Sequence, residues 1–181
     1  EGGSPQDLRQ VFDLLVSAAD FEEFRAKQGE KGTLRELARK SVRWTSGEPV
    51  NTAARKASVL LQLALADPPR PQLTWDLRSQ QAQLLKKSAF LAPLLIELFR
   101  SKGQGRPLLE VLRLRQCLRQ QLWFDSALQV RQLASIGDAG AERLQQRGMG
   151  TLAALLDGDP RQIEFALGRK APFGNQLQAK V

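Results

Sequence analysis

Apolar residues recur along most of the chain at the spacing of a helix that buries one face. Val11 and Leu15 stand four apart near the start, and the same period returns after Thr33 and again between 76 and 102. Such a period favours helices. Sustained alternation of apolar and polar residues, which would favour strands, does not occur. The pattern therefore predicts an all-α fold, built as a multi-helix bundle.

Small polar residues predict where the first helices begin. Ser4 is placed to cap a helix that has Pro5 at its first position, and Thr33 stands three residues before Glu36, the spacing of a capping box. The run AARKASVLLQLALA, which follows Thr52, is apolar enough to predict a helix that is buried on most sides.

Prolines and glycines predict the interruptions between helices. Loops are expected in three places: 47–50, 67–71 and 101–105. Pro93 should either split the helical stretch from 76 to 102 into two helices or kink one helix. A long helix is then expected from Pro107 to about Phe124.

The last third of the chain has a pattern of its own. Between 133 and 167, two short helices should meet at a tight turn at Ile136-Gly137, and a second pair should follow the break at Gly148 and Gly150. This pattern resembles a helix-hairpin-helix unit, in which backbone N–H groups at a helix N-terminus bind a phosphate. The resemblance implies that Ser135 and Gly137 contact nucleic acid.

Two residues of this turn depart from the motif. Ser135 stands where the first glycine is usual, and Asp138 puts a carboxylate beside the expected phosphate site. The departures favour a unit that acts only as a structural spacer, and both interpretations stay open.

The chain offers little for catalysis. It has 181 residues, enough for one substantial core and a smaller appendage, but no histidine and one cysteine, Cys117. His-dependent triads, the usual zinc sites and an internal disulfide are therefore excluded. Neither a P-loop nor a G-x-G-x-x-G turn occurs. We expect no catalytic residue, metal or cofactor in this fragment, and no membrane span.

The charge points to an anionic partner. Lys and Arg number 27 against 19 Asp and Glu, which gives a net charge of +8. Seven cations and two anions lie between Arg100 and Arg131, so most of the excess is local. We expect nucleic acid rather than a membrane surface as the partner, although a solvated basic face would show the same excess.

The long helix expected after Pro107 carries arginines in an unexpected place. A helical wheel puts Arg115 and Arg119 in the middle of an apolar stripe formed by Leu108, Val111, Leu112, Leu118 and Leu122. The wheel puts most other polar residues, among them Glu110 and Arg113, on the opposite, solvated side. Two unpartnered guanidinium groups would be costly to bury.

Two interpretations of these arginines compete. In the first, their stems lie on the core and their heads reach water or acidic neighbours. In the second, the helix lines a channel for a nucleic-acid strand, where guanidinium groups meet phosphates and amides supply adaptable hydrogen bonds. The residues that would make these contacts are Arg113, Arg115, Gln116, Arg119 and Gln120.

Three motifs carry a resemblance to a known family: DLLVSAADFEEFRAKQGEKGTLREL near the start, a long helix that ends in QQLWFDS, and then the helix-hairpin-helix-like unit. With the order of the elements, they resemble the Sec-sixty-three homology (Brl-type) domain, which follows the motor domains of large Ski-two-like helicases and also occurs in an endoplasmic-reticulum translocation protein. The resemblance covers nearly the whole chain. Within the family, FRAKQGEK, LWFDS and especially RKAPFGNQLQAKV are similar to the meiotic crossover-promoting DNA helicases, and the run from Pro172 to Gln176 is the most specific of these signals.

This resemblance implies a non-catalytic domain of a nuclear enzyme that unwinds DNA from 3′ to 5′ in meiotic recombination. ATP and Mg would be bound by the motor domains of the parent chain, which would be partners of this domain together with single-stranded DNA. The helix from Arg106 to Phe124 would be the family's ratchet helix, which contacts the translocating strand. We divide the chain into a bundle over 1–127, a helix-hairpin-helix-like unit over 128–169 and an extension over 170–181.

Three alternatives remain: a spliceosomal relative acting on RNA, a protein-interaction module as in the translocation protein, and an isolated helix-hairpin-helix protein without a motor. Trp123 is expected to be a core anchor rather than a strand contact. The chain begins at Glu1 and shows no leader, so we expect a fragment excised from a longer protein.

Overall fold

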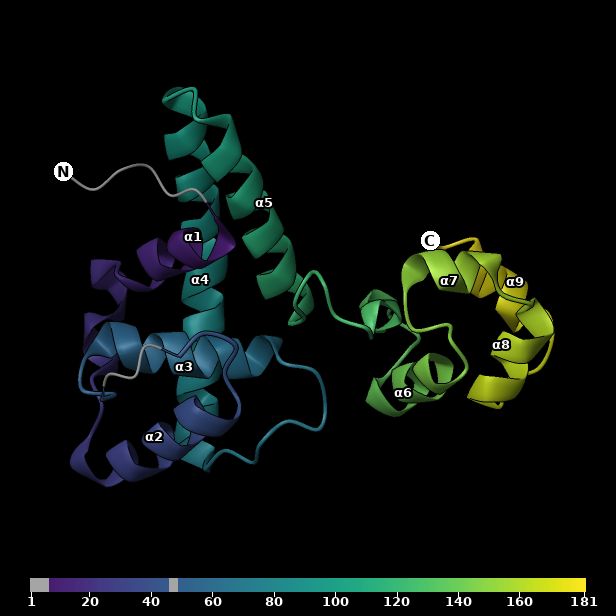
Figure 1. Ribbon diagram of the computed structural model, residues 1–181, viewed down its shortest axis with the longest axis horizontal. Coiled ribbons are helices and arrows are strands. Elements are labelled where there is room, and N and C mark those ends of the chain that lie inside the picture. The colour runs from purple at the N-terminus through teal and green to yellow at the C-terminus, as the bar shows by residue number, and fades with distance from the viewer. Residues whose placement is uncertain (1–6, 46–48) are drawn as a thin grey trace. The chain divides into compact units, whose positions relative to one another are not determined.

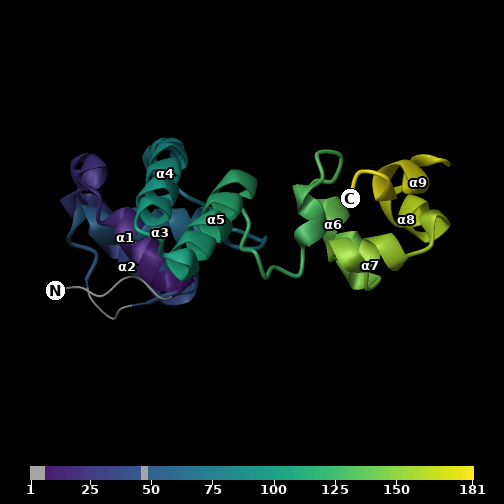
Figure 2. The same cartoon turned by 90° about the horizontal axis from the view of Figure 1, so that it is seen from above.

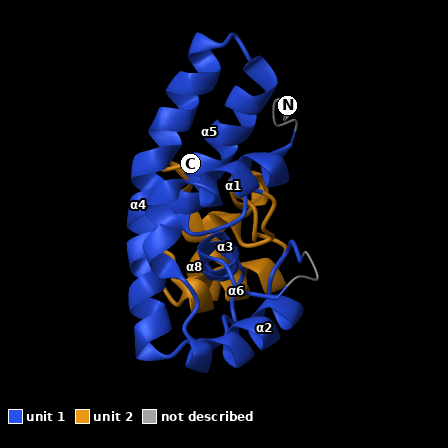
Figure 3. Cartoon of the chain, turned by 90° about the vertical axis from the view of Figure 1, so that its left-hand side faces the viewer, with its two compact units in different colours: residues 1–124 blue, residues 125–181 orange. Residues whose placement is uncertain are grey.

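The computed structural model describes residues 7–45 and 49–181, and these residues form helices, turns and loops without a strand. The all-α prediction is confirmed. Contacts divide the chain into two compact units, called unit 1 (1–124) and unit 2 (125–181) (Figure 3). The division expected from the sequence placed a first boundary after residue 127 and a further one after 169.

Unit 1 is a bundle in which α1 and α3 run across the long helix α4, while α5 packs beside α4 (Figures 1 and 2). Its α-helices are α1 Leu8–Val16, α2 Lys31–Lys40, α3 Ala53–Leu65, α4 Trp75–Ser101 and α5 Gly105–Gln120. Two 3-10 turns, η1 Ala19–Phe24 and η2 Gln28–Glu30, connect α1 to α2.

The central helix α3 is buried along most of its length, as predicted from its apolar run. Thr52 caps it, because the Thr52 hydroxyl accepts a hydrogen bond from the Arg55 backbone N–H at 3.2 Å. The neighbouring α4 has 27 residues, which makes it about 40 Å long. Pro93 lies inside α4 and does not split it into two helices.

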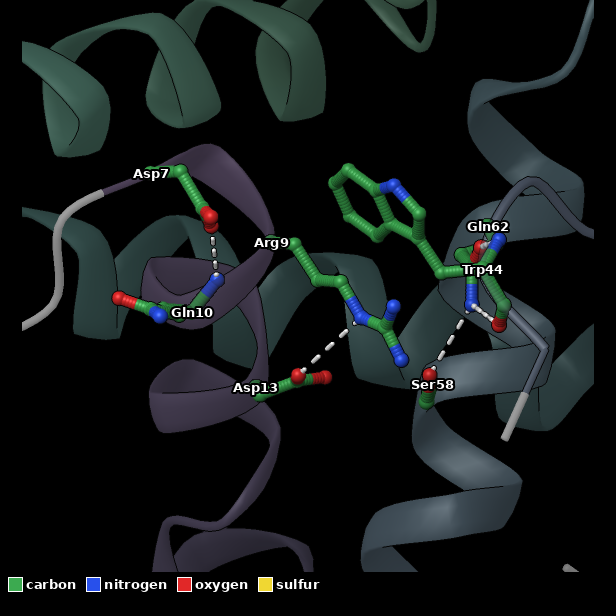
Figure 4. Close-up of polar contacts among 7 residues, drawn as sticks. All are labelled: Asp7, Arg9, Gln10, Asp13, Trp44, Ser58 and Gln62. Atoms are coloured by element: carbon green, nitrogen blue, oxygen red, sulfur yellow. Dashed lines mark hydrogen bonds and ion pairs between the residues drawn. The ribbon is translucent and has the colours of Figure 1, made fainter.

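Two predicted helix starts need comment. Asp7 caps α1, since its carboxylate accepts from the Gln10 N–H at 2.8 Å (Figure 4), whereas Ser4 and Pro5 lie outside the described residues. The capping box predicted at Thr33 and Glu36 is wrong, because α2 already begins at Lys31. The loop predicted at 47–50 falls partly on residues 46–48, which are also outside the described part of the chain.

Glu30 stands at the N-cap position of α2, but its side chain makes no cap bond there and its carboxylate turns toward a buried lysine. Lys56 on α3 is completely buried, and its Nζ lies 2.5 Å from Glu30 Oε2. The other Glu30 oxygen accepts from the Gln80 side chain of α4 at 3.2 Å, and the Lys27 backbone N–H donates to Oε2 at 3.0 Å. The pair therefore joins η2, α3 and α4 at one point, where a lone ammonium could not be buried.

A cluster of aromatic rings forms part of the unit 1 core. Trp44 and Trp123 meet edge to face with ring centroids 5.0 Å apart, and Phe12 packs against both. Gln62 on α3 holds Trp44 in place, since Gln62 Oε1 accepts from the Trp44 backbone N–H at 2.7 Å while its amide donates to Ser58 at 3.1 Å (Figure 4). Trp123 is 7% exposed, which confirms it as a core anchor.

The C-terminal end of α5 is tied to the C-terminal end of α3. The Trp123 backbone N–H donates to the Leu65 carbonyl at 3.1 Å. Gln121, which caps α5 in the left-handed region at φ 50°, offers its carbonyl to Arg70, and the same guanidinium bonds the Ala66 carbonyl. One backbone–backbone bond and the Arg70 side chain thus fix the end of α5 to the end of α3.

Unit 2 consists of four short α-helices and one 3-10 turn around its own core. The elements are η3 Gln129–Gln132, α6 Asp138–Gln146, α7 Leu152–Asp157, α8 Pro160–Leu167 and α9 Phe173–Gln178. Val130, Leu144 and Ile163 are fully buried at its centre. Thr151 caps α7 as predicted, since its hydroxyl accepts from the Ala154 N–H at 3.1 Å.

Gly174 gives the run from Pro172 to Gln176 a structural role. A Cβ on Gly174 would stand 2.2 Å from the Pro160 carbonyl oxygen, so α9 can meet the start of α8 only through glycine. The Gly174 N–H donates at 2.9 Å to the buried Glu164 carboxylate, which holds the two helices together.

We predict that Glu30→Ala destabilises the chain by about 3–5 kcal/mol, because it leaves the Lys56 ammonium buried without a counterion. Urea unfolding followed by circular dichroism measures the change. Glu36→Ala is the control, since Glu36 pairs with Lys40 on the exposed surface and its loss should leave the midpoint nearly unchanged. Equal midpoints for the two variants would contradict the prediction.

The same carboxylate should make stability depend on pH. Burial alone would raise the pKa of Glu30, but its hydrogen bonds from Lys56, Lys27 and Gln80 outweigh this and lower the pKa below its ordinary value of 4.5. Glu30 therefore stabilises the fold above pH 4.5 and loses this contribution as the pH falls through the lowered pKa. Glu30→Gln should flatten the acid limb of a plot of unfolding free energy against pH, whereas parallel curves for both proteins would contradict this assignment.

Gly174→Ala should destabilise unit 2 by about 1–3 kcal/mol, because the added methyl group forces α9 away from α8. Amide hydrogen exchange, resolved by residue, measures the opening free energy of each unit. The neighbouring exposed residue provides the control, Asn175→Ala, which should leave the exchange of Ile163 unchanged. Unaltered exchange in Gly174→Ala would show that α9 tolerates the shift.

Candidate nucleic-acid interface

Helix α5 buries one face against α4 and α1. The side chains on this buried face recur at spacings of three and four: Pro107, Val111, Leu114 and Leu118, with Glu110 and Cys117 beside them. The opposite face carries most of the charge of the helix. The outer surface of the helix is thus formed by exposed residues, most of which are polar or charged.

The helical wheel misplaced two arginines. It put Arg115 and Arg119 in the middle of the buried stripe, yet both are exposed. The error comes from Leu112, which the wheel counted as core but which is 45% exposed, whereas Leu114 is fully buried. Leucines stand on both sides of the helix, so the sequence pattern alone could not tell which side α4 covers.

Arg115 and Arg119 are available to a ligand. They stand one helical turn apart, at the spacing of neighbours on a helix surface. Neither forms an ion pair with any carboxylate in the part of the chain that the structure describes. Of the first interpretation, acidic partners are therefore absent within 7–45 and 49–181, while heads that reach water agree with the exposure of both side chains.

The other predicted contacts on α5 differ from this pair. Arg113 is bound by Glu110 at 2.7 Å and lies over the Phe124 ring at 5.7 Å. Glu110 itself is buried, so its predicted place on the solvated side was wrong. Gln116 is exposed and Gln120 is half-buried. Arg113 is therefore held in place by partners of its own.

The cation excess between Arg100 and Arg131 is only partly neutralised. Arg100 pairs with Glu97, Arg113 with Glu110, and Arg131 with Asp138. Within the described residues, the cations of this segment that have no ion pair are Lys102, Arg106, Arg115 and Arg119. All four are exposed, and three of them belong to α5. Because the uncompensated charge follows one helix, it suits an extended polyanion.

One neighbour of this surface was not found from the sequence. Arg43 lies over three rings, at 5.2 Å from that of Trp123, 5.6 Å from that of Trp44 and 6.0 Å from that of Phe124. Phe124 is partly exposed and lies within cation-π distance of both Arg43 and Arg113. Only the tertiary fold brings Arg43 to the end of α5, so no local pattern could have signalled it.

In unit 2, the predicted residues Ser135 and Gly137 are both exposed. Gly137 is the N-cap of α6, and with Ser135 it lines a cleft of about 340 Å³ together with Arg143, Arg169 and Phe173. Asp138, which the sequence placed as an opposing charge, is bound to Arg131. Asp138 thus has a cationic partner, although it also lines the cleft, together with the two arginines.

Comparison with known proteins identifies the family of the chain. The family model of the Sec63 Brl domain matches residues 3–173, so the chain belongs to the Sec63 Brl domain family. None of the helices described between 7 and 181 combines the length and hydropathy needed to cross a membrane.

Several curated helicases are similar to the chain. An 85-residue segment, 47% of the chain, is 38% identical to "ATP-dependent DNA helicase homolog MER3" of Arabidopsis thaliana and covers 8% of that protein. "Probable ATP-dependent DNA helicase HFM1" of Xenopus tropicalis is 25% identical over 97% of the chain and 13% of its own length. "U5 small nuclear ribonucleoprotein 200 kDa helicase" of Homo sapiens is 24% identical over 83% of the chain and 7% of its own length. The chain thus spans less than a sixth of each relative.

Proposed function

We propose that the chain is the non-catalytic Sec63 domain of an ATP-dependent DNA helicase, and that α5 guides single-stranded DNA along its exposed arginines. The observation that carries the proposal is the pair Arg115 and Arg119, exposed and without an ion pair among the described residues. A guanidinium donates several hydrogen bonds in a fixed plane and suits a phosphate. Contacts to the backbone do not read the base, which suits a motor that must pass over any sequence.

The remaining α5 residues extend this track. Arg113 is positioned by Glu110 near Phe124, and Gln116 and Gln120 lie on the same helix and carry amides that can adapt to bases or sugars. The fixed end of α5 supports the proposal, since a guide must keep its direction when the strand moves.

In the parent chain the motor domains would bind ATP and Mg and would contact this domain. The printed names of the relatives support a helicase parent, and two of the three quoted above are named as DNA helicases. We further propose that this parent acts in the nucleus during meiotic recombination, as its resemblance to crossover-promoting helicases implies. Its strand would be DNA rather than RNA.

Ser135 and Gly137 of unit 2 are proposed to contact a phosphate at the start of α6. The ion pair between Arg131 and Asp138 favours this, because it neutralises the nearest carboxylate. The departure of Ser135 from the glycine of the motif leaves its hydroxyl as a further donor.

We predict that Arg115→Ala combined with Arg119→Ala weakens binding of an oligothymidine to the chain and lowers the salt dependence of binding. The slope of log K against log salt should fall by roughly 1.4, at about 0.7 for each phosphate of a single strand that is no longer neutralised. Fluorescence anisotropy over a series of salt concentrations measures it.

A double variant with the same change in charge, Arg9→Ala with Arg25→Ala, is the control. Both arginines are exposed on unit 1 but pair with Asp13 and Glu22, so their removal should leave the slope nearly unchanged. Equal slopes for the two double variants would contradict a direct contact at α5. Tighter binding of oligouridine than of oligothymidine would favour the RNA-helicase alternative instead.

A further inference from the structure

Phe165 on α8 is an aromatic ring left almost entirely in solvent. Its exposed fraction is 73%, the highest of any phenylalanine in the described chain. The ring therefore contributes little to the core of unit 2. Arg147, at the end of α6, lies over it with its Cζ 4.8 Å from the ring centroid.

The surroundings of Phe165 are basic rather than apolar. Arg161 precedes it by one helical turn, Arg169 follows four residues later, and both are exposed. The Arg169 guanidinium lies 5.6 Å from the Phe173 ring, so a second arginine and aromatic pair stands near the first in the chain. None of the three arginines Arg147, Arg161 and Arg169 has an ion pair with a described carboxylate.

The carboxylates of α8 and its cap are engaged elsewhere. Asp159 caps the helix by accepting from the Arg161 backbone N–H at 2.9 Å. Glu164 is buried and accepts from the Gly174 N–H at 2.9 Å. Neither carboxylate forms an ion pair with an arginine in the part of the chain that the structure describes.

The cleft of about 340 Å³ shares the pair Arg169 and Phe173 with this group of residues. Arg169 and Phe173 line it, and so does Arg143 of α6, which stands one turn before Arg147. Arg143 Nε donates a hydrogen bond to the Ala139 carbonyl at 3.1 Å, which holds the side chain in place as part of the cleft lining. Arginines thus occur both at the exposed ring and along the cleft.

This combination fits a single-stranded nucleic acid better than a protein partner. A protein would need a contiguous apolar area, whereas the exposed residues around Phe165 on α8 are Arg161 and Gln162. A single strand offers flat bases that stack on an aromatic ring and phosphates that pair with guanidinium groups.

We propose that Phe165, Arg147 and Arg169 form a strand-binding site of unit 2, in which a base stacks on the part of the Phe165 ring that Arg147 leaves exposed and the two arginines bind the adjoining phosphates. The proposal rests on the proposed function, because it takes the same class of ligand. It adds a contact that senses the base face, whereas the arginine contacts proposed for α5 sense the backbone charge. The two contacts therefore differ in what they require of the strand.

The test compares two fluorescent oligomers of equal length and charge, one of thymidines and one of abasic residues, binding to the 181-residue chain. Phe165→Ala should weaken binding of the thymidine oligomer on the order of tenfold, as expected when one base no longer stacks. It should leave binding of the abasic oligomer and the salt slope unchanged. Phe165→Trp should restore affinity for the thymidine oligomer.

Leu156→Ala is the matched control, because Leu156 is a 49% exposed apolar residue of the same unit and should not alter binding. The melting temperature of Phe165→Ala should equal that of the unaltered chain, since the ring is exposed. An equal loss for both oligomers, or no loss for either, would overturn the stacking site. A loss of binding to a polyglutamate peptide without any change for the oligomers would overturn it in favour of an acidic protein partner.

The same oligomers separate this proposal from that for α5. Removal of the α5 arginines should weaken the binding of both oligomers and lower the salt dependence of binding. Phe165→Ala should weaken the binding of the thymidine oligomer alone. If only the α5 variants act, the site on unit 2 is refuted and the guide helix stands. If only Phe165→Ala acts, the guide helix is refuted and the unit 2 site stands.

Discussion

The burial of the Lys56 ammonium constrains the rest of unit 1. A charge at the centre of a helical bundle must be met by a carboxylate, and Glu30 reaches it only because η2 turns inward before α2. The same carboxylate takes a hydrogen bond from Gln80 and so fixes where α4 passes α3. Helix α5 packs on α4 and α1 with one face, and Arg115 and Arg119 lie exposed outside that face.

That arrangement explains why a helix rich in leucine can also carry exposed cations. The packing side of α5 is chosen by contact with α4 and α1, not by the hydrophobicity of the helix alone. Leu109 and Leu112 remain substantially exposed beside Arg115 and Arg119 as a result. An outer face of mixed leucine and arginine is compatible with a strand that has both apolar base faces and charged phosphates.

The sequence predicted the parts of the fold that depend on local chemistry. The cap at Thr52 and the buried run of α3 were correct, as was the break before Thr151. It failed where contacts with distant residues determine the structure. Glu30 pairs with Lys56, and α2 begins before the cap predicted at Thr33. The helical wheel could not tell that Leu114 is buried and Leu112 exposed. The arginine and aromatic pairs of Arg43 and Phe124, and of Arg147 and Phe165, arise from contacts between separate elements, which no periodicity encodes.

The bond from the Trp123 N–H to the Leu65 carbonyl has a mechanical consequence. It links the segment directly after α5 to the most deeply buried helix of unit 1, and Arg70 adds a second link at Gln121, the C-cap of α5. A lateral force applied to the outer face of α5 would be borne by α3 and its packed neighbours rather than by a yielding loop. The C-terminal end of the basic helix is therefore anchored to the core of unit 1, so that displacing α5 would require breaking these bonds.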